Sequence, residues 1–272
     1  MSGEDIRPDL REDAEAPAYR TESADEHVFH MWEPLKFETK AGYDYCRKAW
    51  YLRALTAVVR TFAFVVLQIY ERLILGYRVV GRENLKPLRG KGAVTVCNHV
   101  HPLDCTMVDL VLYPKRTYYL TMESNFRIPG IRHLIRVLGG VPLPRQPKRM
   151  LEMFRAMGEA ADGGAVVHIY PEGVLIPYCE TLRPFKNGAF RFVAQKQMPV
   201  VPMVITQRQP KGLYRLLKRK PCLTLNILPA QMPDGAMKPK AAAAALASEC
   251  RIAMQHRMDL CRKNETKGGL TA

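Results

Sequence analysis

A short apolar run that ends in a polar turn limits the folds open to this chain. Residues 94–97 read Val-Thr-Val-Cys, and β-branched side chains of this kind indicate a buried strand. Asn98 breaks the run and Pro102 restricts the backbone, so a tight turn is expected at the carboxyl end of the strand. Asp104 then opens a segment with helical spacing. Because ligands of open α/β folds bind at the carboxyl ends of strands, we predict the active site at this turn.

The change from an apolar run to a turn and then to a helix recurs along the chain. Further strands are predicted over residues 76–81, 117–121, 165–170, 199–206 and 223–228, and helices over 131–138, 148–162, 189–197 and 239–262. A basic loop at 208–220 joins the last two strands. Strands that alternate with helices imply a mostly parallel sheet covered on both faces. The predicted fold class is therefore α/β, with a mostly parallel central sheet flanked by helices.

The segment 42–76 precedes this sheet and has the pattern of an amphipathic helix, with apolar side chains at spacings of three and four. Basic residues lead the segment, and its uncharged run, 61–70, is shorter than the roughly twenty residues that span a bilayer. Such a helix suits docking in the plane of a membrane interface, and packing on the domain gives the same pattern. Both interpretations stay open, and a transmembrane span is not expected.

Charge is spread unevenly along the chain, which has a net charge of +15. Residues 1–26 hold nine acids and three arginines, so they carry −6 and the remainder carries +21. The acidic residues 1–30 are predicted to be a disordered tail, followed by the segment 42–76 and a domain over 77–265. A body this basic attracts an anionic membrane surface, an acidic partner or nucleic acid, but the sequence contains no recognisable nucleic-acid-binding motif.

The cysteines indicate a reducing compartment. Seven of them stand at scattered positions without a CxxC pair, and the chain opens on an acidic segment rather than on a signal peptide. Reduced thiols in a cytoplasmic compartment are the simplest interpretation.

Three interpretations fit the polar residues His99, His101 and Asp104. One histidine can act as a general base while the aspartate fixes its tautomer, since an unperturbed imidazole has a pKa of about 6.5. Alternatively, the three residues are ligands of a metal-dependent hydrolase, which would need further ligands. The third interpretation is a polar turn without chemistry. Against it stand site-like residues at other predicted strand ends, namely Arg145, Glu172, Gly173, Lys186 and Gly188.

The order of these residues resembles the glycerolipid acyltransferase family, typified by lysophosphatidic acid acyltransferase, over about residues 75–230. Asn98-His99 with Asp104 five residues after the histidine looks like the first family motif. Later motifs are matched at 140–145 (Gly-Val-Pro-Leu-Pro-Arg), 170–173 (Tyr-Pro-Glu-Gly), 185–188 (Phe-Lys-Asn-Gly) and 200–203 (Val-Val-Pro-Met). One such motif is a weak signal, whereas several in the family order are a strong one.

The resemblance implies transfer of a fatty acyl group from acyl-CoA or acyl-carrier protein to a lysophospholipid hydroxyl, in phospholipid biosynthesis. His99 would be the general base and Asp104 its orienting partner, without a metal or a bound cofactor. The enzyme would work at the cytoplasmic face of the cell membrane, as a peripheral or monotopic protein that meets anionic lipids. Arg145 and Lys186 would bind the acceptor's phosphate, and backbone N–H groups near Gly173 would bind the oxyanion. The full substrate-binding set is Asn98, Arg145, Glu172, Gly173, Lys186 and Gly188.

One position departs from the family pattern. The third motif of the family usually continues Glu-Gly-Thr-Arg, whereas Glu172-Gly173 is followed by Val174 and Leu175. The missing arginine is implicated in phosphate recognition in the family, and Arg183 is the candidate to replace it. The resemblance therefore leaves the acceptor open between lysophosphatidic acid and a lysolipid with another head group.

Overall fold

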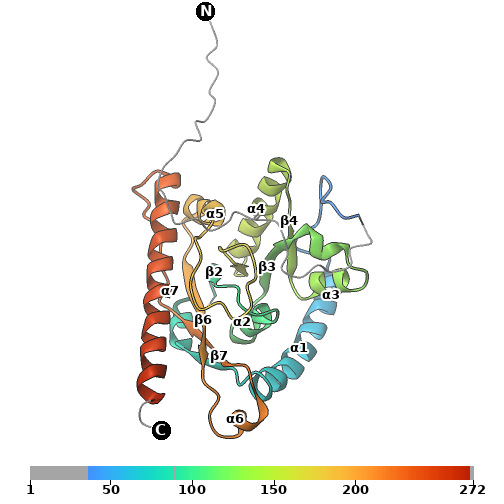
Figure 1. Cartoon of the computed structure of the whole chain (residues 1–272). Coiled ribbons are helices and arrows are strands. Elements are labelled where there is room, and N and C mark those ends of the chain that lie inside the picture. Colours follow the sequence, from blue (N-terminus) through green and yellow to red (C-terminus); the bar gives the residue numbers. More distant parts are fainter. Residues whose placement is uncertain (1–35, 89, 270–272) are drawn as a thin grey trace, which may run out of the picture.

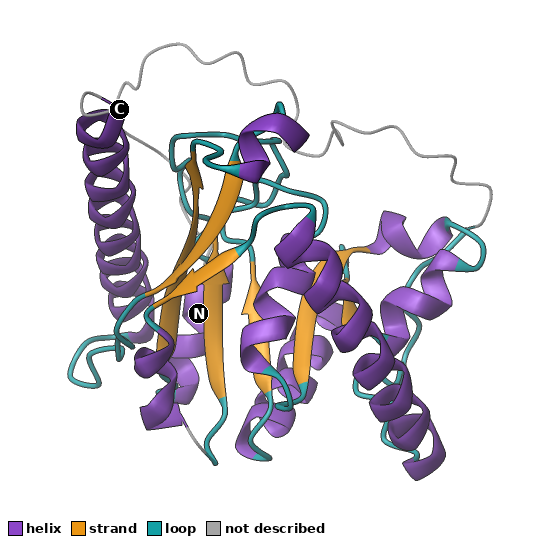
Figure 2. Cartoon of the chain, turned by 90° about the horizontal axis from the view of Figure 1, so that it is seen from below, coloured by secondary structure: helices purple, strands orange, loops and turns teal. Residues whose placement is uncertain are grey.

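A seven-stranded sheet forms the centre of the computed structural model, which describes residues 36–88 and 90–269 (Figures 1 and 2). The strands lie in the order β1-β7-β6-β2-β5-β3-β4, and every neighbouring pair is parallel except β6 and β7. This order confirms the predicted α/β class. The predicted acidic tail, residues 1–30, lies outside the described residues. The strands are β1 Arg78–Val80, β2 Ala93–Cys97, β3 Thr117–Met122, β4 Gly140–Leu143, β5 Val166–Ile169, β6 Val200–Arg208 and β7 Cys222–Ile227.

Helices cover both faces of the sheet because successive side chains of a strand point to opposite sides. In β2, Val94 and Val96 pack in one core with α4 (Pro147–Asp162), α5 (Gly188–Lys196) and α7 (Pro239–Gly269). Ala93 and Cys97 belong to the core on the other face, which α2 (Asp104–Leu112) covers. All five residues of β2 are buried, and β2 is the middle strand. The predicted site therefore lies at the centre of one edge of the sheet.

The sequence pattern predicts neither β4 nor the short helix α6. Residues 140–143 form an edge strand although they contain Pro142, since an edge strand tolerates a residue that donates no hydrogen bond. The basic loop 208–220 contains α6 (Leu213–Leu217), whose three leucines are exposed. The remaining helices are α1 Trp50–Leu73, α3 Ile131–Val137, and the 3-10 helices η1 Arg82–Leu88 and η2 Glu123–Arg127.

Helix α1 packs along α2 through polar contacts (Figure 1). The Nη2 of Arg60 donates to Oδ1 of Asp109 at 2.6 Å, and the buried Glu71 accepts a hydrogen bond from the hydroxyl of Thr106. The predicted segment 42–76 is helical from Trp50 to Leu73, because residues 42–49 form turns with left-handed backbone at two positions. One side of the helix is thus fixed to the domain by polar groups.

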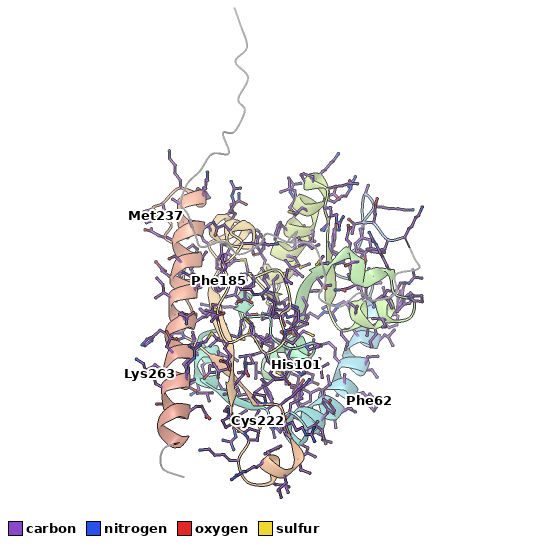
Figure 3. All side chains as sticks on the ribbon, in the orientation of Figure 1. Phe62, His101, Phe185, Cys222, Met237 and Lys263 are labelled. Carbon is purple, nitrogen blue, oxygen red and sulfur yellow. The ribbon has the colours of Figure 1, made fainter. Side chains whose placement is uncertain are left out.

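The other side of α1 is apolar and points outward. Phe62, labelled in Figure 3, is 71% exposed, and large apolar side chains are exposed along the whole helix. With 24 residues, α1 is long and apolar enough to cross a membrane by length and composition, in contrast to the expectation drawn from the uncharged run 61–70. One side of α1 therefore packs on the domain, and the other side is an exposed apolar face.

Candidate active site

His99 and Asp104 are joined by a hydrogen bond at the carboxyl end of β2. The Nδ1 of His99 and the Oδ2 of Asp104 are 2.6 Å apart, and the carboxylate is fully buried. Asp104 is the first residue of α2, so the turn between strand and helix brings together two side chains five positions apart. The Oδ2 also accepts from the backbone N–H groups of Val100 at 3.2 Å and His101 at 3.4 Å. These bonds fix the carboxylate and, through it, the imidazole.

This pair has the geometry of a general base. An Nδ1–H that donates to a carboxylate leaves the lone pair on Nε2, and the Nε2 of His99 has no hydrogen-bond partner among the described residues. The side chain of His99 is 26% exposed, so a substrate can reach the ring. The arrangement can therefore take a proton from a hydroxyl group.

Asn98 uses its whole side-chain amide to join two strands. Its Oδ1 accepts from the backbone N–H of Ile205 at 2.8 Å, and its Nδ2 donates to the carbonyl of Ile205 at 3.0 Å. Ile205 lies on β6, so this pair extends the contact between β2 and β6 beyond Cys97, where the backbone of β2 turns away. The structure thus places Asn98, which the resemblance assigns to substrate, in the junction between the strands.

Glu172 joins the end of β5 to the same turn. Its Oε2 accepts from the backbone N–H of His99 at 3.2 Å and from Nη2 of Arg183 at 2.6 Å, while its Oε1 accepts from the Arg183 backbone N–H at 3.0 Å. The Glu172 side chain is 1% exposed, which makes this a buried ion pair. Arg183, the candidate to replace the family arginine, is therefore held by Glu172.

Gly173 and Lys186 lie against each other beside Glu172. Gly173 has a φ of 77°, and a Cβ at this position would lie 2.9 Å from both Cε and Nζ of Lys186, so both conformation and space favour glycine. The N–H of Gly173 donates to the carbonyl of Tyr170 at 3.1 Å. By contrast, the N–H of Val174 donates to no group in the described part of the chain. The Lys186 ammonium group and one unused N–H therefore stand at this strand end.

Arg145 and Gly188 lie at the periphery of the site. Arg145 follows the edge strand β4, three strand positions from β2, which corresponds to about 14 Å across the sheet. Its side chain is exposed and has no hydrogen-bond or ion-pair partner within residues 36–88 and 90–269. Gly188 is the first residue of α5, and a Cβ there would meet open space. Glu172, Gly173 and Lys186 are thus the predicted residues that the fold brings to the dyad.

His101 belongs to the turn and not to a metal-binding arrangement. Its Nδ1 accepts from the backbone N–H of Leu103 at 3.1 Å, and its ring meets Tyr178 edge-on at 5.8 Å. Burial lowers the pKa of His101, against the opposite effect of Asp104. In the described part of the chain, no group of three or more His, Cys, Asp or Glu side chains is arranged to hold a metal ion. These donors do not fit the alternative of a metal-dependent hydrolase.

Tyr170 and His168 form a wall behind the ring of His99, and the resemblance assigns a role to neither. The Tyr170 ring stacks on the His99 ring with centroids 4.0 Å apart, and the His168 ring meets Tyr170 edge-on at 4.6 Å. His168 is fully buried and shares a 2.7 Å hydrogen bond with Thr95. Burial, and then the charge of His99, lowers the pKa of His168 to about 3, so this imidazole is neutral. The two-residue spacing at the end of a strand was a signal that both side chains share one face.

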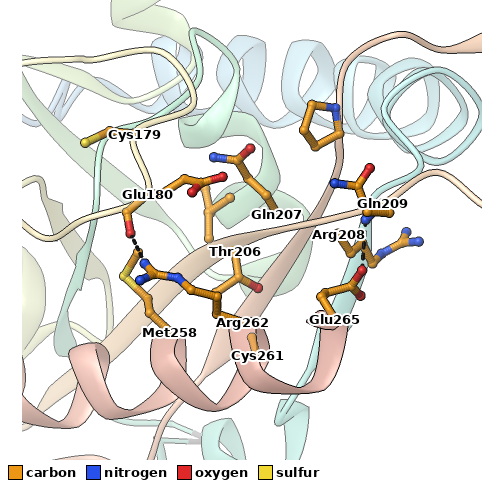
Figure 4. A pocket seen from close by; sticks show the side chains of 12 residues that line it. Cys179, Glu180, Thr206, Gln207, Arg208, Gln209, Met258, Cys261, Arg262 and Glu265 are labelled. Carbon is orange, nitrogen blue, oxygen red and sulfur yellow. Dashed lines mark hydrogen bonds between the residues drawn. The ribbon is translucent and has the colours of Figure 1, made fainter. Parts of the chain in front are cut away.

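The segment 174–183 crosses over the turn. The N–H of Ile176 donates to the carbonyl of His99 at 3.1 Å. Part of this segment also lines a cavity of about 260 Å³ together with β6 and α7 (Figure 4). There Arg262 donates to the carbonyl of Glu180 at 2.7 Å. The residues that line this cavity include neither member of the dyad, so it is separate from the site.

Known proteins similar to this chain are acyltransferases. The acyltransferase family model matches residues 76–206. The chain is 32% identical to the chloroplastic 1-acyl-sn-glycerol-3-phosphate acyltransferase of Brassica napus, over 47% of this chain and 36% of that protein. It is 27% identical to the 1-acyl-sn-glycerol-3-phosphate acyltransferase of Saccharomyces cerevisiae, over 50% of this chain and 45% of that protein. The chain therefore spans less than half the length of either relative.

The fold has a counterpart among solved structures. The crystal structure of the 1-acyl-sn-glycerophosphate (LPA) acyltransferase PlsC from Thermotoga maritima superposes with a TM-score of 0.51 at 20% identity, over 78% of this chain and 79% of that chain. At this identity the likeness shows a shared fold. The region matched by the family model contains the dyad and the group formed by Glu172, Gly173 and Lys186. In its sheet, in the order of its motifs and in this match, the chain is similar to the acyltransferase family.

Proposed function

We propose that this protein transfers a fatty acyl group from an acyl thioester to the hydroxyl of a lysophospholipid such as 1-acyl-glycerol-3-phosphate. The proposal is carried by the 2.6 Å hydrogen bond between His99 and Asp104 at the centre of an acyltransferase-family domain. Support for the acceptor comes from the names of the two curated relatives. The donor is acyl-CoA or acyl-carrier protein, and the chemistry requires no metal or bound cofactor.

The reaction proceeds by direct attack of the acceptor hydroxyl on the thioester. The Nε2 of His99 takes the hydroxyl proton while the oxygen forms a bond to the carbonyl carbon, which gives a tetrahedral oxyanion. Asp104 stabilises the resulting imidazolium through the Nδ1–H bond. When the intermediate collapses, the C–S bond breaks and the proton on Nε2 passes to the departing sulfur. The products are an ester and a free thiol.

The oxyanion needs a preorganised hydrogen-bond donor near His99. The resemblance points to N–H groups near Gly173, but the N–H of Gly173 itself donates to Tyr170. The next N–H, that of Val174, is unused among the described residues, and it lies two positions before Ile176, which bonds the carbonyl of His99. We therefore assign the Val174 N–H as the oxyanion donor.

Lys186 is the cation best placed for the acceptor's phosphate. Its ammonium group lies against Gly173, and it precedes the N-terminus of α5, where unpaired N–H groups favour an anion. Arg183 has its Nη2 engaged by Glu172 and the carbonyl of Val174, so it serves the loop. Arg145 reaches a ligand that extends along the sheet edge. Buried Asn98 and Glu172 then position the turn around His99.

The protein binds its lipid substrate at a membrane surface, where α1 lies in the plane of the interface. Arg60 and Glu71 tie one side of α1 to α2, so this helix stays with the domain when its other side enters lipid. The apolar side chains that it exposes are Trp50, Tyr51, Leu55, Val58, Phe62, Val65, Val66, Ile69, Tyr70 and Leu73. The positive charge of the chain favours the cytoplasmic face of the cell membrane, with its anionic lipids.

Helix α6 extends this docking surface. The hydroxyl of Tyr214 donates to the carbonyl of Arg72, and Nζ of Lys218 donates to the carbonyl of Leu75 at 2.9 Å, so α6 lies at the carboxyl end of α1 (Figure 1). Leu213, Leu216 and Leu217 are 68%, 85% and 67% exposed, respectively, between basic residues. Apolar and basic side chains in one loop suit contact with an anionic lipid surface.

Turnover of defined substrates tests the proposed function. The protein is incubated with acyl-CoA or acyl-carrier protein and a panel of lysolipids, and thiol release is followed. His99→Ala and Asp104→Asn should each lower kcat by roughly a thousandfold, because the base or its tautomer is lost. His101→Ala is the matched control and should retain activity within about tenfold, since general-base catalysis is intact. Near-normal turnover by His99→Ala would refute the assigned base, and absence of transfer to every lysolipid would refute the function.

A further inference from the structure

A basic cleft of about 810 Å³ lies at the end of the sheet opposite the catalytic turn. The first half of α1, residues of α4 and the residues that precede β3 and β5 line it. Residue 165 lines the cleft and residue 172 belongs to the catalytic group, so a strand rise of about 3.3 Å per residue puts the two sites roughly 20 Å apart. The charged residues of the lining are Lys48, Arg53, Arg60, Arg116 and Glu159.

Carboxylates neutralise two of these four cations. Arg60 pairs with Asp109 at 2.6 Å, and Lys48 pairs with Glu159 at 3.1 Å. Neither Arg53 nor Arg116 has a carboxylate partner within the part of the chain that the structure describes. The cleft therefore holds two uncompensated positive charges.

Arg116 is the residue that points to a ligand. Its Nε and Nη2 atoms are shielded from solvent and have no hydrogen-bond partner in the described residues. Its guanidinium carbon lies 5.1 Å from the centroid of the Tyr118 ring, a contact that orients the group. These two nitrogen atoms have lost water and gained no acceptor in the described residues, which is costly. An anion in the cleft would supply the missing acceptor.

Further arginines raise the positive potential beside Arg116. Burial lowers the pKa of Arg47, and the charges of Arg136 and Arg116 lower it further. Asp44, which acts in the opposite direction, is the weaker influence on this group. The neighbourhood of the cleft is therefore a cluster of like charges that a bound anion would relieve.

We propose that the cleft binds a phosphate group through Arg53 and Arg116, and that this phosphate is the head group of an anionic phospholipid. The parallel N–H donors of guanidinium groups match phosphate oxygens. The same helix that carries Arg53 exposes Trp50 by 80% and Tyr51 by 59%, side chains suited to the interface between lipid chains and head groups. The proposed membrane association supplies only the source of the phosphate, since the cleft itself is formed by the folded chain.

Phosphate binding to the full-length protein tests the site. Inorganic phosphate is titrated by calorimetry, and flotation is measured with phosphatidylcholine vesicles with and without phosphatidic acid. Arg116→Gln and Arg53→Gln are compared with Arg215→Gln, which removes an exposed arginine of α6. Melting temperatures verify that each variant is folded. Because Arg53 is exposed, Arg53→Gln still tests the site if Arg116→Gln does not fold.

We expect both cleft substitutions to weaken phosphate binding about tenfold or more, while Arg215→Gln leaves it within about twofold. Flotation on phosphatidic acid should fall further in the cleft variants than in Arg215→Gln, which reports general attraction to the surface. Weaker phosphate binding with flotation equal to that of Arg215→Gln would overturn the lipid source. Phosphate binding unchanged in both cleft variants would overturn the site. His99→Ala should bind phosphate normally. Phosphate binding therefore tests the cleft independently of whether the protein transfers acyl groups.

Discussion

The phenol ring of Tyr170 lies flat against the imidazole of His99, with ring centroids 4.0 Å apart and planes inclined by 16°. Asp104 holds the same imidazole at its Nδ1, so the ring is fixed both in its plane and at one edge. A base held in this way presents Nε2 in one direction. If His99 is the base, as proposed, Tyr170 is expected to position its ring; it directly precedes the Pro-Glu-Gly that carries the family resemblance.

Two replacements of Tyr170 should distinguish the contribution of its aromatic ring to kcat from that of its hydroxyl group. Tyr170→Leu should lower kcat about 10- to 100-fold with little change in KM, because a poorly oriented base weakens the chemical step rather than substrate binding. Tyr170→Phe keeps the stacked ring and should restore kcat to within a fewfold of the wild type. Steady-state kinetics with one lysolipid measures both. Equal losses in the two variants would assign the effect to the phenol hydroxyl and contradict a stacking role.

Loss of Arg183 should destabilise the domain because it leaves a buried carboxylate without its cation. Glu172 is 1% exposed in this pair, and breaking such a pair from one side costs about 3–5 kcal/mol of unfolding free energy. Adding Glu172→Gln to Arg183→Gln should recover part of that loss. Urea denaturation measures the changes, with Lys196→Gln as control for an exposed pair, worth about 0–1 kcal/mol. An Arg183→Gln effect as small as the control would show that solvent screens the pair.

Glu71 should make the stability of the domain depend on pH. Burial raises the pKa of its carboxyl to about 7 from the ordinary value of 4.5. Between these values the unfolded chain has released the proton while the folded chain retains it, so the free energy of unfolding falls as pH rises and levels off above pH 7.

Glu71→Gln should remove this dependence. One pKa unit corresponds to about 1.4 kcal/mol. The free energy of unfolding of Glu71→Gln, relative to that of the wild type, should therefore rise by roughly 3 kcal/mol between pH 4.5 and 8. Urea denaturation across this range measures it, with the exposed Glu249→Gln as the matched control. An advantage of Glu71→Gln that does not change with pH would mean that Glu71 titrates normally.

Single polar substitutions should weaken membrane docking from both α1 and α6. Phe62 and Leu216 are 71% and 85% exposed, and burial of a side chain of this size contributes about 1.5–3 kcal/mol, so Phe62→Ser and Leu216→Ser should each lower vesicle affinity roughly tenfold or more. Flotation on vesicles that contain phosphatidylglycerol measures the change. Ile252→Ser on α7, 62% exposed, should have no effect. An equal loss for Ile252→Ser would contradict the proposed orientation, in which α1 and α6 face the membrane and α7 does not.

Local patterns were sufficient to predict most of the sheet. The buried strands β2, β5 and β6 are β-branched runs that end in turns, and their identity follows from residues close in the sequence. Pro142 conceals β4 in the sequence, because proline donates no hydrogen bond to a neighbouring strand and is less often found in short strands, whereas the edge position tolerates it. The antiparallel pairing of β7 with β6 also could not be predicted from local patterns, because strand direction depends on how the chain packs.

The sequence by itself determined the class of fold and predicted the pair formed by His99 and Asp104, since both residues and the turn between them are local features. Only the tertiary structure decided which polar groups are already in use. Asn98 bonds Ile205 through both its oxygen and its nitrogen, and Glu172 is held by Arg183, whereas Nε and Nη2 of Arg116 have no acceptor among the described residues. Hydrogen bonds and ion pairs form between residues far apart in the chain, so their partners follow from packing and not from spacing.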